Sequence, residues 1–560
     1  MDRRSRPCDN VRAHMLTLLA TAALVDLLLV NGRIWSNDQE WQALAASGGR
    51  VVATGSDPEM RALAGPQTRI IDLRGRRALP GFRDSHLHLL EGGRGLSQIS
   101  LKDAADEAEF GRRLREFDRK LPPGSWILGG NWDHDRTFGG KLPTKELIDK
   151  HVSGRAVVID RYDGHMAVAN SRALALAGVT AATRDPPGGV IVRREGSLEP
   201  SGLLRDKAAD LVKGKAPPPS PAEIDDAIRA ALRQAARDGV TAMEDMGQDL
   251  PGPGDILLAH LFRRYQELAR AGELTSRIAL WWPLRRWAEL ARLGAESGLG
   301  NDFVRIGGLK GYMDGSLGSS TAKMFAPYLN EPGSTGIFVN DPSQMREWIR
   351  SADAAGLRVS VHAIGDRGNA ELLDIVAQVE KINGPRDRRF RDEHTQHVRA
   401  QDIPRFKSLE VVASMQPYHA IDDGRWAEGR IGTKLLGTSY AYRSLLDAGA
   451  HLAFGSDWPV APLSPVLGID AAVNRRTLDG KHPEGWFPQQ RISAREAVLA
   501  YTREAAWAAM READEGSLEP GKLCDVVVLS RDVLDPAEAG HIAETTVAMT
   551  IVGGRVVHQE

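Results

Sequence analysis

Cysteine is almost absent from this chain of 560 residues, which contains only Cys8 and Cys524. Two thiols exclude a disulfide framework and a cysteine-rich zinc site. Any metal ion must therefore be held by histidine, aspartate, glutamate or a modified side chain. An excess of charge of either sign is also missing, because the formal net charge is −2. The composition thus gives no indication of nucleic acid or an anionic membrane surface as a partner.

A long apolar run is missing as well. Residues 15–25 (MLTLLATAALV) follow the basic start MDRRSRP and resemble a secretory signal, but Asp26 interrupts them early. The run is shorter than the roughly 20 residues that a transmembrane helix needs, so we expect no stable membrane anchor. Residues 1–25 are predicted to be a signal or a disordered tail, unless the start codon is mis-assigned. The protein is then either cytoplasmic or exported.

The two ends of the chain have the same character. Short β-type segments with tight turns occur at residues 26–35, 48–56 and 68–80, and again at 522–530 and 547–560. The simplest arrangement is one small β-sandwich domain built from both termini, residues 26–78 plus 516–560. The larger domain, residues 79–515, is inserted between them.

Within the larger domain, apolar β-type segments alternate with amphipathic helical patterns. The first segment ends at His86, and the others cover residues 239–247, 276–284, 304–315, 357–366, 389–397, 410–418 and 450–460. Eight strands alternating with helices predict an α/β protein with a (β/α)8 TIM barrel. The first gap is too long for one helix, so residues from about 92 to 221 are predicted to form an insertion after strand one.

A pair of histidines ends the first predicted strand, in LPGFRDSHLHLL (residues 79–90). Residues i and i+2 of a strand share a face, so His86 and His88 offer two neighbouring imidazoles to a metal. Alone, they could equally be surface or core-edge histidines. However, the ends of other predicted strands carry Lys310, His362, His394 and Asp457, and a TIM barrel collects such residues at one mouth.

These motifs make the chain resemble the amidohydrolase superfamily, and within it the YtcJ-like branch that includes N-substituted formamide deformylases. The resemblance covers almost the whole chain from Asp26 and is carried by PGFRDSHLHL, LKGYMDGSLGSSTA, VHAIGDRGN, RDEHTQ, QPYHA, GSDWPVAPLSP and GSLEPGKLCDVVVL. Arg83 departs from the aliphatic residue that is more usual there, RDEH replaces arginine-aliphatic-Glu-His, and Cys524 replaces alanine. None of these departures removes a predicted ligand.

The resemblance implies a centre of divalent metal ions, two zinc ions, in the barrel mouth. His86, His88 and Asp457 would hold the buried ion, and His362 and His394 the outer one. Lys310 would bridge them as a carbamate, because a protonated ammonium repels metal ions; a structural ion pair with Asp314 is the alternative. A metal-bound hydroxide would attack a carbonyl-type carbon, with Asp457 as metal ligand and general base.

The predicted substrate-binding residues come from two segments of the insertion and from the loop after strand seven. Residues 131–144 contain Trp132 and residues 161–174 contain His165, which we interpret as substrate ligands brought over the mouth; the alternative places them in the insertion's core. The predicted pocket is further lined by Tyr418, Trp426 and Arg430. Such an aromatic mouth favours a small-molecule substrate with an apolar or aromatic group. A homodimer is compatible with the sequence.

The leading hypothesis is a metal-dependent hydrolase that cleaves a non-peptide C–N bond, as in an amide or formamide. One alternative keeps the metals and acts on a lactone, ester or cyclic imide; another is a mononuclear deaminase, although deaminases of this superfamily usually lack the lysine of strand four. A non-catalytic scaffold is disfavoured, because such proteins lose metal ligands and all six are present here.

Overall fold

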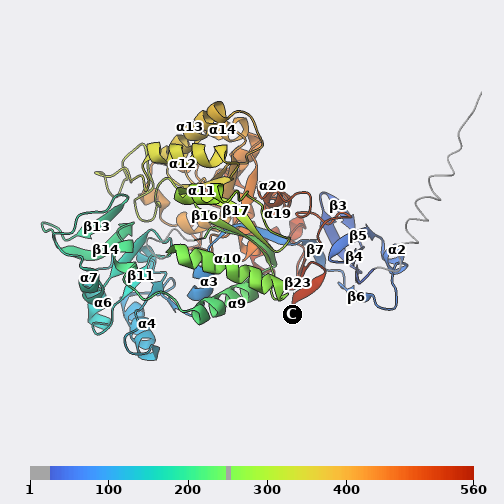
Figure 1. Cartoon of the computed structure of the whole chain (residues 1–560), viewed down its shortest axis with the longest axis horizontal. Coiled ribbons are helices and arrows are strands. Elements are labelled where there is room, and N and C mark those ends of the chain that lie inside the picture. The colour runs from blue at the N-terminus through green and yellow to red at the C-terminus, as the bar shows by residue number, and fades with distance from the viewer. Residues whose placement is uncertain (1–24, 248–253) are drawn as a thin grey trace, which may run out of the picture.

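An eight-stranded parallel sheet lies at the centre of the computed structural model, which describes residues 25–247 and 254–560 (Figure 1). Its strand order is β21-β20-β19-β18-β17-β16-β15-β8, and all neighbouring pairs are parallel. The strands are β8 (Phe82–Leu87), β15 (Val240–Asp245), β16 (Arg277–Pro283), β17 (Val304–Tyr312), β18 (Val359–Ala363), β19 (Arg391–His394), β20 (Val412–Met415) and β21 (Leu452–Phe454). The predicted TIM barrel is confirmed.

Helices follow the barrel strands and cover the outside of the sheet. They include α9 (Pro221–Arg237), α10 (Gly254–Arg270), α11 (Trp287–Arg292), α12 (Pro342–Ala354), α13 (Asp366–Asn383), α14 (Ile403–Ser408), α15 (Pro417–Asp423), α17 (Tyr442–Asp447), α18 (Pro465–Asn474), α19 (Ala494–Ala500) and α20 (Arg503–Ala508). In α13, Leu373, Ile375 and Val376 are buried in the same apolar cluster as Val361 of β18. Burial of such faces on the sheet is the main stabilising term of this fold class.

The first and last strands, β8 and β21, meet at the seam of the barrel. Beyond the end of β21 the backbone N–H of Asp457 donates to the carbonyl of His86 (2.6 Å), and that of His88 donates to the carbonyl of Trp458 (2.9 Å). Gly455 is required at this seam, because a Cβ there would lie 2.5 Å from the backbone nitrogen of His86. The barrel therefore closes through the residues that the sequence predicts as metal ligands.

A separate α/β layer lies between β8 and β15 in the chain and forms one end of the molecule (left in Figure 1). Its strands β11 (Val158–Asp160), β12 (Met166–Ala169), β14 (Pro200–Asp206) and β13 (Gly189–Arg193) form an antiparallel sheet in that order. Its helices include α4 (Glu107–Lys120), α5 (His134–Phe138), α6 (Lys145–His151), α7 (Ser171–Ala177) and α8 (Asp210–Lys213). The long insertion after strand one is present, and the helix that follows it, α9, begins at Pro221.

The strands of the two termini form two further sheets at the other end of the molecule (right in Figure 1). One has the order β5-β4-β1-β6, with β1 (Leu27–Val30), β4 (Ala43–Ser47), β5 (Arg50–Gly55) and β6 (Arg69–Asp72). The other has the order β24-β23-β22-β7-β2-β3, with β2 (Arg33–Ser36), β3 (Gln39–Trp41), β7 (Arg77–Pro80), β22 (Val526–Leu529), β23 (Val547–Val552) and β24 (Arg555–Gln559). Strand β22 pairs with β7, so this β domain uses both termini.

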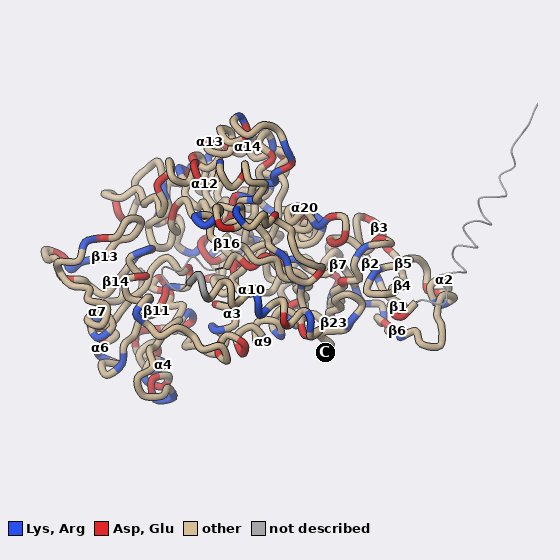
Figure 2. The backbone as a smooth tube through the Cα atoms, in the orientation of Figure 1, with Lys and Arg blue, Asp and Glu red and all other residues tan. Residues whose placement is uncertain are grey.

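Leu29, Leu44, Val528 and Ile551 of these sheets share one buried apolar cluster with Cys524, whose thiol has no disulfide partner within residues 25–247 and 254–560. The exact domain limits, 26–78 plus 516–560 against 79–515, stay a prediction. The predicted signal or tail lies outside the described residues except for Val25. Among the described residues, none of the helices combines the length and the apolar character needed to span a bilayer. Figure 2 shows that segments of both charge signs alternate along the backbone.

We predict that Arg77 holds the two termini together. Its buried guanidinium (3% exposed) contacts Asp532 and Glu40, both at 2.7 Å. Arg77→Leu leaves these carboxylates without their buried partner, so the free energy of unfolding is expected to fall by about 3 kcal/mol in equilibrium denaturation. Arg33 contacts the same two carboxylates but is 49% exposed, and Arg33→Leu is expected to cost less than about 1 kcal/mol. Equal losses in the two variants would contradict this role.

Candidate metal centre

The six predicted ligands converge on one cavity at the C-terminal ends of the barrel strands. His86 lies in β8 and His88 directly after it, Lys310 is in β17, His362 in β18 and His394 in β19, and Asp457 follows β21. All six line a cavity of about 860 Å³, together with residues of the insertion. The seam between β8 and β21 thus brings His86 and Asp457, which lie far apart in the sequence, together at this cavity.

His86, His88 and Asp457 form a compact group of potential ligands. The Nε2 atoms of both histidines lie 3.5 Å from Oδ1 of Asp457. His86 uses its other nitrogen, Nδ1, to contact Glu393 at 2.5 Å, and His88 donates from Nδ1 to the carbonyl of Gly247 at 3.2 Å. Such partners on the outer nitrogen fix the imidazole tautomer and leave Nε2 free for a metal ion.

His362 and His394 form the other side of the centre. Their ring centroids are 4.5 Å apart, and that of His394 is 4.8 Å from His86. His394 donates from Nδ1 to Oε1 of Gln416 (2.7 Å), and His362 donates from Nε2 to the carbonyl of Gly315 (3.0 Å). Each ring therefore keeps one nitrogen without a hydrogen on it. His394 and Asp457 also have positive φ angles (82° and 57°), a conformation that is uncommon for non-glycine residues and recurs at active sites as well as in turns.

The histidines of this centre are held in the neutral form. Burial lowers the pKa of His86 and His394 well below the usual value, and the neighbouring cation Lys310 and other imidazoles lower it further. Burial also lowers the pKa of His88 to about 4. Neutral imidazoles keep the lone pair that a metal ion requires, so this donor set fits a divalent cation.

Lys310 and Asp457 both have shifted acidities. Burial lowers the pKa of Lys310 to about 8, although Glu393 and Asp457 oppose the shift, and its Nζ lies 3.3 Å from Nε2 of His86. Burial raises the pKa of Asp457 to about 7. Asp314, the alternative partner of Lys310, instead accepts backbone N–H groups of Ile364, Gly365 and Lys323. The amine of Lys310 is thus aimed at the histidine group.

His419 joins this centre and was missed in the sequence. It lies in α15, directly after β20, and its Nε2 is 3.8 Å from Oδ2 of Asp457. With His394 and Asp457 it forms a second buried group that could hold a metal ion. Its Nε2 is buried and has no hydrogen-bond partner among the described residues. The motif QPYHA after the seventh predicted strand contains His419, but the pocket residue that the sequence predicts there is its neighbour Tyr418.

Of the predicted substrate residues, His165 and Trp426 line the cavity. The ring of His165 lies 4.9 Å from that of His362, and its Nδ1 is 2.7 Å from Oδ1 of Asp206. Burial opposes protonation of His165, but the hydrogen bond to Asp206 and its charge raise the pKa above the usual value. The insertion therefore supplies a histidine with a raised pKa that faces the barrel ligands.

Trp132, Tyr418 and Arg430 are not among the described residues that line the cavity. Trp132 is fully buried in the apolar core of the insertion, where its indole donates to the carbonyl of Ile159 (2.9 Å). Arg430 contacts Asp135 at 3.3 Å, and the structure leaves Tyr418 beside the site, in the same helix as His419.

Asp133, His134 and Asp135 form another group with ligand-like spacing, but it is not a comparable site. Arg425 contacts Asp133 at 3.0 Å, and Arg430 contacts Asp135. Guanidinium groups already neutralise these carboxylates and would repel a metal ion. We interpret this cluster as the polar contact between the insertion and the loop after β20.

Comparison with known proteins agrees with this geometry. Residues 69–558 match the amidohydrolase family. The chain is 38% identical to Protein LONG AFTER FAR-RED 3 of Arabidopsis thaliana, over 98% of this chain and 94% of that protein. It is 31% identical to putative amidohydrolase YtcJ of Bacillus subtilis (93% and 96%) and 27% identical to N-substituted formamide deformylase of Arthrobacter pascens (94% and 97%).

The architecture also agrees with a solved structure. An uncharacterized metal-dependent hydrolase from Pyrococcus horikoshii superposes with a TM-score of 0.73 at 27% identity, and the match covers 92% of this chain and 99% of that one. The similarity therefore extends over the insertion and the β domain as well as the barrel.

We predict that His88 is a metal ligand whose removal leaves the fold intact, because its side chain is 22% exposed and lies at the end of β8. His88→Ala is expected to lower the affinity for a divalent ion more than about tenfold. Elemental analysis of dialysed protein measures the bound metal. The control is His451→Ala, which removes a partly exposed histidine that stacks on Trp507 and does not line the metal cavity. Unchanged metal content in His88→Ala would remove His88 from the ligand set.

Proposed function

The chain belongs to the amidohydrolase family, and from this premise we propose that it hydrolyses a non-peptide C–N bond of an amide or formamide with the help of divalent metal ions. The observation that carries the proposal is the convergence of His86, His88, Lys310, His362, His394 and Asp457 on one cavity at the barrel mouth. The similarity to an N-substituted formamide deformylase along 94% of the chain supports the choice of bond.

In this proposal His86, His88 and Asp457 would hold an inner zinc ion, and His362 and His394 would hold an outer one. Lys310, as a carbamate, would supply oxygen ligands to both. A carbamate forms only from the neutral amine, and the pKa of about 8 makes neutral Lys310 available near neutral pH. The free Nε2 of His419 offers the outer ion a further ligand. When bound, such ions lower the pKa of water and polarise a carbonyl oxygen.

Asp457 carries the proton through the reaction. Burial raises its pKa to about 7 without a metal ion, and a bound cation would lower this value, so that the carboxylate would be ionised and able to accept a proton. It takes a proton from the attacking water, whose oxygen forms the new bond to the carbonyl carbon. The C–N bond then breaks, and Asp457 delivers the proton to the leaving nitrogen. The first products are a carboxylic acid and an amine. Transfer of the acid's proton to the amine then gives a carboxylate and an ammonium ion, so atoms and charges balance.

His165 orients the substrate from the opposite wall. In its protonated form, which the hydrogen bond to Asp206 favours, it would donate a hydrogen bond from Nε2 to the carbonyl oxygen of the substrate, where negative charge develops during attack. Apolar side chains form much of the remaining wall: Leu128, Val158, Ile224, Leu257, Leu317, Trp426 and Val460. A substrate with an apolar or aromatic group on nitrogen fits such a wall.

The direct test is a substrate panel with the metal-loaded protein. We expect hydrolysis of N-benzylformamide and related amides, measured as release of the amine, at rates above those for a matched lactone, ester and cyclic imide. Asp457→Asn is expected to lose at least about 100-fold in kcat. Turnover of the lactone or imide in preference to the amide would favour the alternative substrates, and ammonia release from an amino-substituted ring would favour a deaminase.

Lys310 provides a separate prediction for the bridge. Lys310→Ala is expected to lose one of two bound ions and most activity, and added acetate to restore part of both by supplying bridging oxygens. Lys310→Glu retains a carboxylate at this position and is expected to keep more metal than Lys310→Ala. Elemental analysis and amine release measure the two effects. Full activity of Lys310→Ala with an unchanged metal content would refute the bridge.

A further inference from the structure

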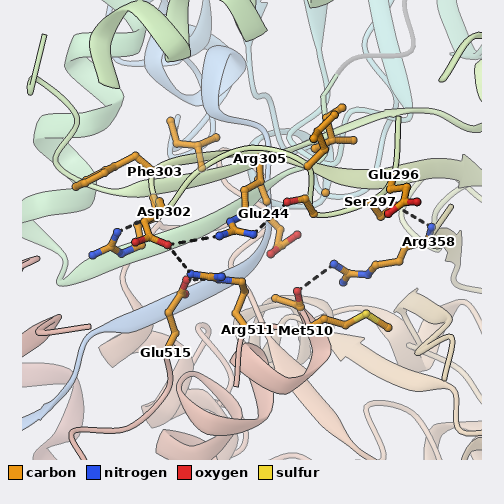
Figure 3. Close-up of a pocket in the computed structure, with 18 of the residues that line it drawn as sticks. Glu244, Glu296, Ser297, Asp302, Phe303, Arg305, Arg358, Met510, Arg511 and Glu515 are labelled. Carbon is orange, nitrogen blue, oxygen red and sulfur yellow. Dashed lines mark hydrogen bonds and ion pairs between the residues drawn. The ribbon is translucent and has the colours of Figure 1, made fainter. Parts of the chain in front are cut away.

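A second cavity, of about 450 Å³, lies at the opposite end of the barrel from the metal centre (Figure 3). It is formed where β8, β16, β17 and β18 begin and where the chain continues after α20. Its polar lining includes Arg83, Glu244, Arg277, Asp302, Arg305, Arg358, Arg511 and Glu515. These residues take no part in the proposed hydrolysis.

Most arginines of this cavity are neutralised by carboxylates. Arg83 contacts Glu244 at 2.6 Å and also Glu515, and Arg277 contacts Asp525 at 2.7 Å. Arg511 contacts Glu515 at 2.8 Å, as Figure 3 shows. The buried carboxylates of the lining, Glu244 and Glu515, are therefore already paired with Arg83 and Arg511.

Arg358 and Arg305 are less completely paired with carboxylates than the other arginines of the lining. Buried Arg358 donates to the backbone carbonyls of Ala508 (2.6 Å) and Ala509 (3.0 Å), and to no carboxylate among the described residues. Arg305 lies 3.4 Å from Asp302, which it shares with Arg511 at 3.2 Å. Burial lowers the pKa of Arg358 to about 10 and also lowers that of Arg305, so both charges are held at a cost.

Unused hydrogen-bond donors lie in the same place. The Nε atoms of Arg83, Arg305 and Arg358 are buried and have no partner among the described residues. Arg83 and Arg358 are themselves more than nine-tenths buried. Buried donors are normally satisfied by protein groups or by ordered water, so the guanidinium groups that line this cavity keep donor capacity beyond their protein contacts.

The mouth of the cavity is apolar. Leu299 is 57% exposed and Met510 is 38% exposed, and both line the cavity with Phe303 and Ile306. Glu296 also lies on the rim but is exposed to solvent, where water and salt screen its charge. The cavity thus combines positive charge inside with an apolar entrance.

We propose that this cavity binds an organic monocarboxylate, whose anionic group is held by Arg305 and Arg358 and whose apolar body covers Leu299 and Met510. Guanidinium groups favour carboxylates because they present several donors in one plane. The site lies outside the hydrolytic cavity, so the proposal stands independently of the bond that the enzyme cleaves.

The test uses benzoate as the probe, with the metal-loaded full-length protein and isothermal titration calorimetry. Benzyl alcohol has the same body without the charge, and acetate has the charge without the body. Leu299→Asp places a negative charge at the mouth and is expected to weaken benzoate binding at this site about tenfold, as is Arg305→Gln. The matched control is Leu293→Asp, because Leu293 is 80% exposed and does not line the cavity.

Benzoate can also bind the metal ions, and the variants separate the two sites. We expect one class of benzoate sites that Leu299→Asp and Arg305→Gln weaken and Leu293→Asp leaves unchanged, with acetate and benzyl alcohol binding it at least tenfold more weakly than benzoate. A crystal of the benzoate complex is expected to show the ligand beside Arg305. Equal binding by Leu299→Asp, Leu293→Asp and the unchanged protein would overturn the proposal. So would a crystal with benzoate only at the metal centre, or benzyl alcohol binding as tightly as benzoate.

Discussion

The seam between β8 and β21 is the constraint on which the rest of the structure depends. The hydrogen bonds that close the barrel join the backbones of His86 and Asp457, and of His88 and Trp458. Closure and assembly of the inner ligand group are therefore one event. The carboxylate of Asp84 reinforces it, because Oδ1 accepts from the backbone N–H groups of both His86 and Ser456 at 3.0 Å. A barrel that failed to close would have no metal centre, whatever its other strands carried.

Directly below the metal centre, the barrel interior is charged. Glu393 contacts His86 with one oxygen, and its other oxygen accepts from Ser360 and Arg391, both at 2.7 Å. Burial alone would raise the pKa of Glu393, but the charges of Arg391 and Lys310 lower it. Such a network costs stability, because its members lose their hydration. The apolar layer between the sheet and its helices supplies the compensating stabilisation, and the network in return fixes the orientation of His86.

The sequence predicted the features that are local or periodic, and it missed those that depend on contacts across the chain. Alternation of apolar segments with helical patterns was sufficient for the barrel, because each strand and helix carries its own signature. His86 and His88 lie side by side, with ring centroids 5.6 Å apart, as the two-residue period of a strand requires. Glu393 contacts His86 across 307 positions, and no local pattern identifies such a partner.

The predicted substrate residues also show that a sequence pattern does not identify which side chains contact a site. Trp132 and His165 both belong to motifs of the insertion, yet only His165 faces the cavity, because the fold of the insertion turns the indole of Trp132 into its own core. In α15 it is His419 that faces Asp457 and lines the cavity, whereas its neighbour Tyr418 does not line it. Sequence patterns name the segments that reach a site, but packing decides which side chain of a segment enters it.

This division also explains why the reaction class is better defined than the substrate. The candidate metal ligands lie at the ends of barrel strands, whose positions are set by the hydrogen-bonded sheet, whereas much of the remaining cavity wall comes from the insertion and from loops. Strand ends keep their geometry when surrounding loops vary, and loops set specificity. Leu128 and Val158 of the insertion, opposite Trp426 of the loop after β20, can therefore change the group that is accepted without moving His86 or Asp457. In the proposed reaction, specificity depends on how the insertion packs over the barrel, and catalysis depends on how the barrel closes.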